Sequence, residues 1–239
     1  MKVSILRKKD RQSEEYMQIF TYLGEMHISI INLLEILNKE ISDRGEDDKI
    51  SYEICYESSC HQGLCGACSM VVNDRPVLAC QTFCDEIVDK EGNIVITPLS
   101  KFPVIQDLSV DRKEIYDSMK QAQLWIEKSQ DVSNKRLQSQ SQAALCLMCG
   151  CCLEACPNYV PNDMFKGMPV ALSALNLISK SADGAHKEDM KKNYKEQVFN
   201  GCTKSMACEK VCPMKIPTVT LMSEANRLSV WKLWKIMYK

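Results

Sequence analysis

The sequence predicts an α+β protein in two parts, a small mixed sheet with one helix followed by an all-α part. Three observations predict this division. Short strand-like apolar segments fill the first 110 residues, helical periodicity fills the remainder, and the fourteen cysteines concentrate in three tight groups. A chain of 239 residues has room for two domains of ordinary size. We therefore expect domains at 1–110 and 111–239.

The first part begins with two strand candidates, K-V-S-I-L-R and M-Q-I-F-T-Y-L, at 2–7 and 17–23. Ser29 is a preferred N-cap residue, and it precedes a helix whose apolar residues fall on one face. A mixed sheet crossed by one helix, with a cysteine loop at its edge, is the β-grasp arrangement of ferredoxins. The apolar helix positions are 30, 33, 34, 37 and 41, and the further strands are expected at 51–54, 67–72, 77–80 and 94–97.

The first cysteine group is C-H-Q-G-L-C-G-A-C at 60–68, which has the spacing of plant-type [2Fe–2S] proteins. Gly63 and Gly66 lie in this loop, because a chain that wraps a cluster closely needs residues without a bulky side chain. A strand–turn–strand segment at 71–80 delivers the fourth thiol. The predicted [2Fe–2S] ligands are Cys60, Cys65, Cys68 and Cys80.

The second part carries two cysteine runs that align with each other, C-L-M-C-G-C-C-L-E-A-C-P at 146–157 and C-T-K-S-M-A-C-E-K-V-C-P at 202–213. The first is the bacterial ferredoxin pattern C-x2-C-x2-C-x3-C-P. The second departs from it because Ser205 replaces one cysteine. Pro, Gly and Asn separate the surrounding helices, which are predicted at 112–129, 136–147, 163–180, 186–199 and 217–237.

In two-cluster ferredoxins the last cysteine of each run ligates the other cluster, and we expect the same crossing here. One site then has four thiols and holds [4Fe–4S]. The other has three, and since a serine hydroxyl is a poor ligand for soft iron, we expect [3Fe–4S] of relatively high potential. The alternative is that Ser205 binds a fourth iron through oxygen. The predicted ligands are Cys146, Cys149, Cys152 and Cys212 for [4Fe–4S], and Cys156, Cys202 and Cys208 for [3Fe–4S].

Zinc and disulfides are the alternatives for so many cysteines. The spacings favour clusters, and the charged N-terminus carries no export signal that would favour disulfides. Cys55, Cys84 and Cys151 remain unassigned, and we expect each to be a small buried side chain. His27 and His186 have no evident partner, so we expect ordinary solvated or satisfied histidines.

Several classes of function are not expected. Lys+Arg (30) and Asp+Glu (31) nearly cancel, which argues against a nucleic-acid partner. No G-x-G-x-x-G fingerprint and no run of 18 apolar residues occurs, so we expect a soluble, cytoplasmic chain. The segment 224–239 is either a membrane-surface helix or one that docks on its own domain. Three clusters without a substrate site indicate a path for electrons.

The three cysteine groups, with L-S-K-F-P-V-I-Q-D-L-S-V-D-R at 99–112 and P-N-D-M-F-K-G-M-P at 161–169, give the chain its resemblance to a known family. The chain resembles the iron–sulfur subunit of succinate dehydrogenase and fumarate reductase. The resemblance implies a partner flavoprotein with FAD and the dicarboxylate site, and a membrane anchor that binds quinone and often haem b. It also implies a peripheral position on the cytoplasmic side of the cell membrane.

The sequence departs from this family at three places. His61 stands where many members have arginine, so the [2Fe–2S] potential is expected to differ. Asn158-Tyr159-Val160-Pro161 lacks the tryptophan of the ubiquinone-reducing branch, and Thr203 replaces its histidine. These departures favour menaquinone and an anchor of the dihaem cytochrome b type. The alternative is a soluble electron-transfer subunit of a thiol-linked fumarate reductase that meets no quinone.

Overall fold

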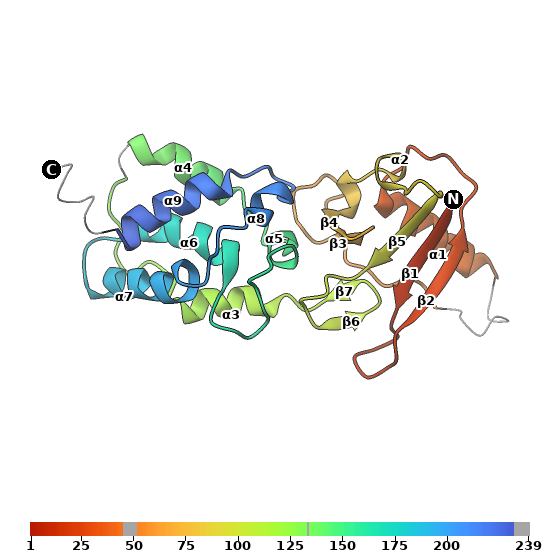
Figure 1. Cartoon of the computed structure of the whole chain (residues 1–239), viewed down its shortest axis with the longest axis horizontal. Coiled ribbons are helices and arrows are strands. Elements are labelled where there is room, and N and C mark those ends of the chain that lie inside the picture. The colour runs from red at the N-terminus through yellow and green to blue at the C-terminus, as the bar shows by residue number, and fades with distance from the viewer. Residues whose placement is uncertain (45–51, 133, 232–239) are drawn as a thin grey trace. The chain divides into compact units, whose positions relative to one another are not determined.

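A computed structural model describes residues 1–44, 52–132 and 134–231 of the chain (Figure 1). The chain divides into two compact units, Met1–Asp111 and Arg112–Lys239. The first unit contains a β-sheet, and the described part of the second is helical.

The sheet of the first unit has five strands in the order β2-β1-β5-β3-β4. β1 pairs in parallel with β5, and all the other neighbours in the sheet are antiparallel. Alternate residues of β1 and β5 are fully buried, as expected for a sheet with one face against a core. The strands are β1 (Lys2–Arg7), β2 (Tyr16–Thr21), β3 (Ser69–Val72), β4 (Arg75–Leu78) and β5 (Asn93–Thr97).

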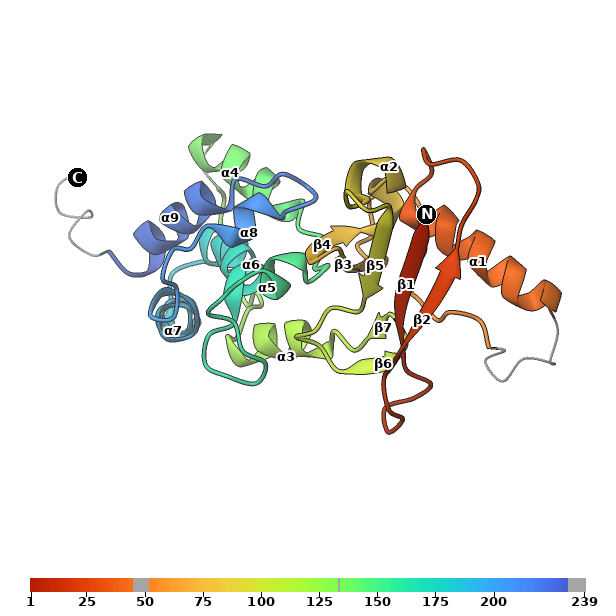
Figure 2. The same ribbon diagram turned by 45° about the vertical axis from the view of Figure 1, so that its right-hand side comes forward.

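Helix α1 (Ile30–Arg44) lies across one side of this sheet (Figure 2). The Ser29 hydroxyl accepts a hydrogen bond from the Asn32 N–H at 3.3 Å, as a helix N-cap does. The predicted apolar face is the buried one, because Ile30, Leu33, Leu34 and Leu37 have no exposed surface and Ile41 is 8% exposed. The predicted helix and its orientation are confirmed.

Strands β3 and β4 form a tight hairpin that leads to Cys80. Asn73 and Asp74 have positive φ angles of 44° and 60°, the pair of conformations that a two-residue hairpin turn requires. The predicted strand at 77–80 is displaced, because β4 ends at Leu78 and a 3-10 turn, η1 (Ala79–Gln81), follows. The short helix α2 (Cys84–Ile87) comes next.

The predicted strand at 51–54 is wrong for residues 52–54, and residue 51 lies outside the described residues. Side chains form hydrogen bonds with the backbone groups of this segment. The buried Arg7 guanidinium donates to the carbonyl oxygens of Tyr52 at 2.9 Å and Glu53 at 3.2 Å, while the Asn38 amide pairs with both backbone groups of Ile54. A segment held in this way has no need of a neighbouring strand.

Asp107 completes this buried network from a small hairpin that the sequence did not predict, β6 (Val104–Gln106) and β7 (Ser109–Val110). Its carboxylate lies 3.0 Å from Arg7 Nε, and both side chains have no exposed surface. It also accepts the N–H groups of Lys8 and Cys55, each at 2.9 Å. The network therefore ties β1 to the segment that leads into the first cysteine loop.

The described second unit contains five helices of eight or more residues. The predicted helix at 112–129 ends early because Gln123 has a left-handed φ of 56°, and that predicted at 186–199 finishes in a π-helical turn. The last predicted helix, 217–237, ends at Ser229, and residues 232–239 lie outside the described residues. The elements are α3 (Lys113–Gln121), α4 (Asn134–Ala144), α6 (Gly167–Lys180), α7 (Ala185–Tyr194), η2 (Lys195–Phe199) and α9 (Thr218–Ser229).

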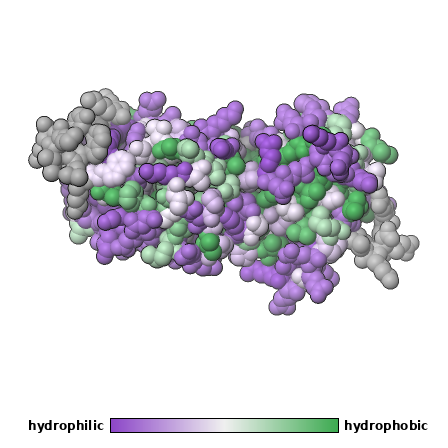
Figure 3. All heavy atoms as spheres, viewed as in Figure 1, coloured by the Kyte–Doolittle hydropathy of each residue, from purple (hydrophilic) through white to green (hydrophobic). Residues whose placement is uncertain are grey.

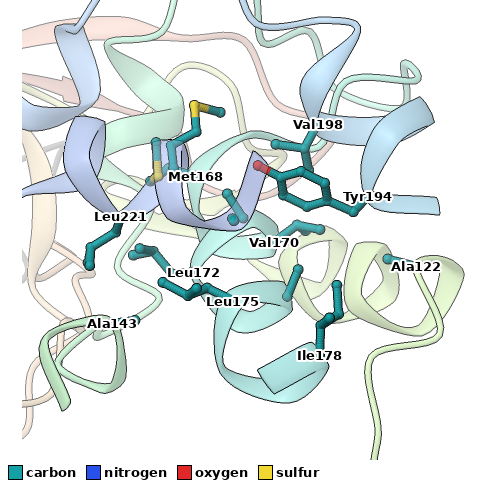
Figure 4. Packing of buried hydrophobic residues seen from close by; sticks show 14 of the residues in the cluster. Ala122, Ala143, Met168, Val170, Leu172, Leu175, Ile178, Tyr194, Val198 and Leu221 are labelled. Carbon is teal, nitrogen blue, oxygen red and sulfur yellow. The ribbon is translucent and has the colours of Figure 1, made fainter. Parts of the chain in front are cut away.

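Helix α6 is the centre of the second unit. Ten of its fourteen residues are buried, and its side chains pack against α4, α7 and α9. Figure 4 shows Leu172, Leu175 and Ile178 of α6 in this core, with Tyr194 and Val198 beside them. Cysteines of both runs pack against this hydrophobic core, namely Cys146, Cys152, Cys202, Cys208 and Cys212.

The described helices include none that is long and apolar enough to cross a membrane. On the face shown in Figure 3, hydrophilic and hydrophobic residues are interspersed in both units. Met17 and Ile19 of β2 and Val95 of β5 are 45%, 66% and 39% exposed, and strand register places Ile19 and Val95 on either side of Ser4. The described residues therefore leave apolar side chains of the sheet exposed on both sides of Ser4.

Candidate metal centres

The loop that carries the first cysteine group adopts a strained backbone. His61, Gly63 and Gly66 have φ angles of 54°, 74° and 77°, which glycine tolerates and most residues do not. A Cβ atom on Gly63 would lie only 2.7 Å from Cγ of Gln81, so the close approach of the loop to η1 depends on this glycine.

Backbone N–H groups of this loop point at sulfur atoms. Cys60 Sγ accepts from Leu64 at 3.2 Å and from Gln62 at 3.4 Å, and Cys80 Sγ accepts from Gly63 at 3.2 Å. These donors favour the thiolate and lower the pKa of Cys60 to about 6, with a contribution from the Cys65 side chain. The loop thus stabilises the thiolate of Cys60 even without bound metal.

The other two thiols complete the group. Burial raises the pKa of Cys68 to about 12, and its side chain is hydrogen-bonded to Cys80 and close to Cys65. The structure therefore places Cys60, Cys65, Cys68 and Cys80 next to one another, as a binuclear cluster requires. His61 lies on the outer side of the loop, with Nδ1 3.7 Å from Glu35 of α1.

In the second unit, the thiols line two cavities. A small one of about 30 Å³ is bounded by four cysteines and by apolar side chains such as Leu172 and Ile216. A larger one of about 370 Å³ is bounded by four cysteines, Ser205 and apolar side chains such as Phe165 and Met222. The cysteines of the small cavity are Cys146, Cys149, Cys152 and Cys212, and those of the large cavity are Cys152, Cys156, Cys202 and Cys208.

The two cysteine runs have the same backbone conformation. Met148 and Lys204, at the third position of each run, have φ angles of 53° and 61°. Gly150 and Met206, at the fifth position, have φ angles of 90° and 59°, and each directly precedes a one-turn helix. These helices are α5 (Cys151–Glu154) and α8 (Ala207–Lys210). The two aligned runs therefore repeat each other in backbone conformation as well as in sequence.

The repeat extends further than the predicted motif. Each Cys-Pro is followed four residues later by a second proline, Pro161 in the first run and Pro217 in the second. Pro217 directly precedes α9. This longer C-P-x-x-x-P pattern is visible in the sequence, but the predicted motif ended at the Cys-Pro pair.

Burial and local donors set the protonation of the cysteines in the second unit. Burial raises the pKa of Cys146 to about 11 and that of Cys208 above its usual value, and it raises the pKa of Cys152 far more. The Cys151 side chain donates to Cys149 and lowers its pKa to about 7. Cys146, Cys152 and Cys208 are therefore protonated without metal at neutral pH, and iron binding to them releases protons.

Two polar residues join the runs beside the large cavity. Asn158 follows Cys156-Pro157, and its Nδ2 donates to the Gly201 carbonyl oxygen at 2.7 Å. Its Oδ1 accepts from the Thr203 hydroxyl at 3.0 Å. Asn158 and Thr203 are two of the positions at which the sequence differs from the ubiquinone-reducing branch, but the hydrogen bond between them was not predicted.

The remaining cysteines and histidines are placed as follows. Cys84 and Cys151 have no exposed surface, as predicted, whereas Cys55 is only half-buried and that part of the prediction is wrong. His27 is hydrogen-bonded to Asp85 at 2.9 Å and stacks on Phe83. His186 stacks on Trp125 and contacts its carbonyl oxygen at 3.1 Å. Across residues 1–44, 52–132 and 134–231, no three His, Cys, Asp or Glu side chains form a site for a single metal ion.

Comparison with known domains defines the class of protein. A family model described as a 2Fe-2S iron-sulfur cluster binding domain matches residues 2–117, and one described as a 4Fe-4S dicluster domain matches residues 142–216. The chain is thus an iron–sulfur protein of α+β layout, with an N-terminal [2Fe–2S] domain that contains a sheet and a helical [4Fe–4S] region.

Comparison with whole proteins defines the family. The chain is 31% identical over 234 residues to the succinate dehydrogenase iron-sulfur subunit of Bacillus subtilis, covering 93% of this chain and 90% of that one. It is 32% identical over 234 residues to that of Coxiella burnetii, covering 90% and 91%. The fumarate reductase iron-sulfur subunit of Wolinella succinogenes is 30% identical over 193 residues, covering 74% and 78%. The chain belongs to the family of iron–sulfur subunits of succinate dehydrogenase and fumarate reductase.

Solved structures agree on the fold. A chain of the Mycobacterium smegmatis Sdh1 complex in the apo form matches with a TM-score of 0.77 at 19% identity, covering 97% of this chain and 96% of that one. A hypothetical protein from Helicobacter pylori matches with a TM-score of 0.58 at 12% identity, covering 99% of this chain and 41% of that one.

Proposed function

We propose that this chain is the electron-transfer subunit of a membrane-associated succinate:quinone oxidoreductase. Electrons pass between FAD on a partner flavoprotein and quinone in a membrane anchor, through [2Fe–2S], [4Fe–4S] and [3Fe–4S] clusters. The observation that carries the proposal is the pair of cysteine-lined cavities that share Cys152. Two redox centres in such cavities are close enough in space to exchange electrons.

The proposed ligands follow from the crossing of the two runs. The domain at 1–110, a β-grasp ferredoxin domain, holds [2Fe–2S], and the domain at 111–239, a two-cluster ferredoxin domain, holds the other two. The cavity lining supports the crossing, since Cys212 joins the thiols of the first run and Cys156 joins those of the second. The ligands are Cys60, Cys65, Cys68 and Cys80 for [2Fe–2S], Cys146, Cys149, Cys152 and Cys212 for [4Fe–4S], and Cys156, Cys202 and Cys208 for [3Fe–4S].

The clusters supply one-electron storage, and the chain supplies binding, insulation and tuning of potential. Backbone N–H groups directed at Cys60 and Cys80 stabilise added negative charge in the first site. Apolar side chains form most of the wall of the large cavity, and Ser205 leaves the proposed three-iron site with three ligand thiols instead of four. The dicarboxylate reaction takes place on the flavoprotein.

Asn158 and Thr203 support an anchor of the dihaem cytochrome b type and menaquinone as the substrate. Their side chains bond to each other and to Gly201, so these polar groups are used within the chain and are less available to a quinone head group. The quinone site then lies mainly in the anchor. The chain itself lies peripherally, on the cytoplasmic side of the cell membrane.

Purification of the complex in detergent from its native membranes tests this function. We expect flavin, haem b and menaquinone to co-purify with about nine irons per copy of this chain, and succinate to reduce the clusters. Co-purification without any membrane haem protein, together with thiol-dependent fumarate reduction, would instead support the soluble alternative. Bound ubiquinone next to Cys156 and Cys208 would contradict the assignment of the quinone.

A further inference from the structure

The large cavity has a polar residue in its wall that belongs to neither cysteine run. Asn226 of α9 lines the cavity together with Cys152, Cys202 and Cys208, and it is only 5% exposed. Most of the remaining wall is apolar, from residues such as Phe165, Met168 and Met222. A buried carboxamide in such a wall has a cost unless its polar atoms find partners.

One half of the Asn226 carboxamide has a partner and the other half does not. Its Oδ1 accepts a hydrogen bond of 2.6 Å from the hydroxyl of Tyr194, which has no exposed surface. Within the described part of the chain, its Nδ2 has no hydrogen-bond acceptor. A separation of 2.6 Å is typical of an O–H···O hydrogen bond and short for N–H···O, so the carboxamide oxygen faces Tyr194 and the N–H groups are left for the cavity.

Tyr194 is itself rigidly held. It lies at the end of α7, in the core formed with Val170 and Val198 (Figure 4). Its burial raises the pKa far above the usual value, so the hydroxyl remains a proton donor throughout the physiological range. The orientation of Asn226 therefore does not depend on pH there.

We propose that Asn226 donates a hydrogen bond to sulfur of the three-iron cluster and raises its reduction potential, with Tyr194 as the positioning residue. The inference rests on the proposed function, because it requires that cluster in the large cavity. An N–H donor stabilises the reduced, more negative form of a cluster over the oxidised form. Cysteine patterns cannot reveal such a donor, since Asn226 lies well beyond the second run.

The experiment is a redox titration of the intact complex, followed by low-temperature paramagnetic resonance, in wild type, Asn226→Leu and Tyr194→Phe. We expect Asn226→Leu to weaken reduction of the three-iron cluster about tenfold, a fall in potential of about 59 mV for one electron. Tyr194→Phe should shift it in the same direction by less. The [2Fe–2S] potential should not move, and Asn176→Leu on α6, outside both cavities, is the matched control.

Each outcome bears on one claim. If wild type lacks a three-iron signal, the proposed function fails. If wild type has the signal and the potential is unchanged in Asn226→Leu, or if Asn176→Leu shifts it equally, the role of Asn226 is overturned. If Asn226→Leu does not retain the cluster, Tyr194→Phe decides, because an unchanged potential there overturns the inference. Electron–nuclear double resonance on wild type should also detect an exchangeable proton and a nitrogen coupled to the cluster.

Discussion

Gly150 and Met206 occupy the same position of the two cysteine runs, and both adopt a left-handed backbone with φ angles of 90° and 59°. Each directly precedes a one-turn helix that carries a cysteine of its run. The repeat thus requires a conformation that glycine adopts freely and methionine adopts at a cost of about 1–2 kcal/mol.

Met206→Gly should stabilise the protein. Met206 is 52% exposed, so the substitution removes little packing while it relieves the backbone. We expect a net gain of about 1 kcal/mol after the greater freedom of glycine in the unfolded chain is counted. This should raise the thermal midpoint for loss of iron–sulfur absorbance by roughly 2–4 °C. Met206→Ala keeps the strain and should gain nothing, and Gly150→Ala should lower the midpoint. Equal midpoints for the glycine and alanine variants of Met206 would refute the strain argument.

Ser205→Cys should convert the three-iron site into a four-iron site. Ser205 lines the large cavity with Cys156, Cys202 and Cys208, so a thiol there would supply the missing ligand. We expect the paramagnetic signal of the oxidised three-iron cluster to disappear and the iron content to rise by about one atom per chain. Ser205→Ala is the control and should keep the signal. A Ser205→Cys complex with an unchanged signal would speak against the ligand assignment.

Cys80 and Cys84 should differ sharply when each is replaced by serine. Cys80 Sγ accepts the Gly63 N–H at 3.2 Å and lies beside Cys68, whereas Cys84 is a fully buried residue at the start of α2. Cys80→Ser should abolish or strongly alter the reduced [2Fe–2S] resonance, and Cys84→Ser should spare it. The two spectra decide the assignment, and loss of the resonance only in Cys84→Ser would reverse it.

Asp107→Ala should strongly destabilise the first unit. It leaves the Arg7 guanidinium buried without its carboxylate, a loss of about 3–5 kcal/mol. The chain offers a matched control in Arg11 and Asp111, which are also 3.0 Å apart but have 60% and 33% of their side chains exposed. Arg11→Ala should change the unfolding free energy by less than about 1 kcal/mol. Denaturant titration of the [2Fe–2S] absorbance measures both variants, and similar losses for the two would mean that burial does not set the strength of the Arg7–Asp107 pair.

Much of the fold could be predicted because periodicity reports burial. The one-sided apolar pattern of 30–41 gave α1, and the Ser29 cap gave its start. The segment 52–54 looked like a strand because Tyr52 and Ile54 are apolar at alternate positions, but side chains of Arg7 and Asn38 take its hydrogen bonds. The β6–β7 hairpin was not predicted, because strands of three and two residues are too short to show a periodic pattern.

The grouping of the cysteines in the candidate site could be predicted from the sequence, but the walls of the cavities could not. Cysteine spacing is local, so the sequence could indicate which thiols belong to each run. The cavity walls are built from residues far apart in the chain, and nothing in the sequence links Tyr194 to Asn226 or Asn158 to Thr203. The Tyr194–Asn226 pair depends on the packing of α7 against α9, and the Asn158–Thr203 pair depends on how the two cysteine runs meet.

A low-temperature paramagnetic resonance titration of the intact complex with succinate would show whether this chain holds three clusters. We expect three separate iron–sulfur signals, with the oxidised three-iron signal disappearing at a higher potential than those at which the other two clusters become reduced. An oxidised complex without a three-iron signal, or a reduced one without a [2Fe–2S] signal, would contradict the assignment of these cysteines to three clusters.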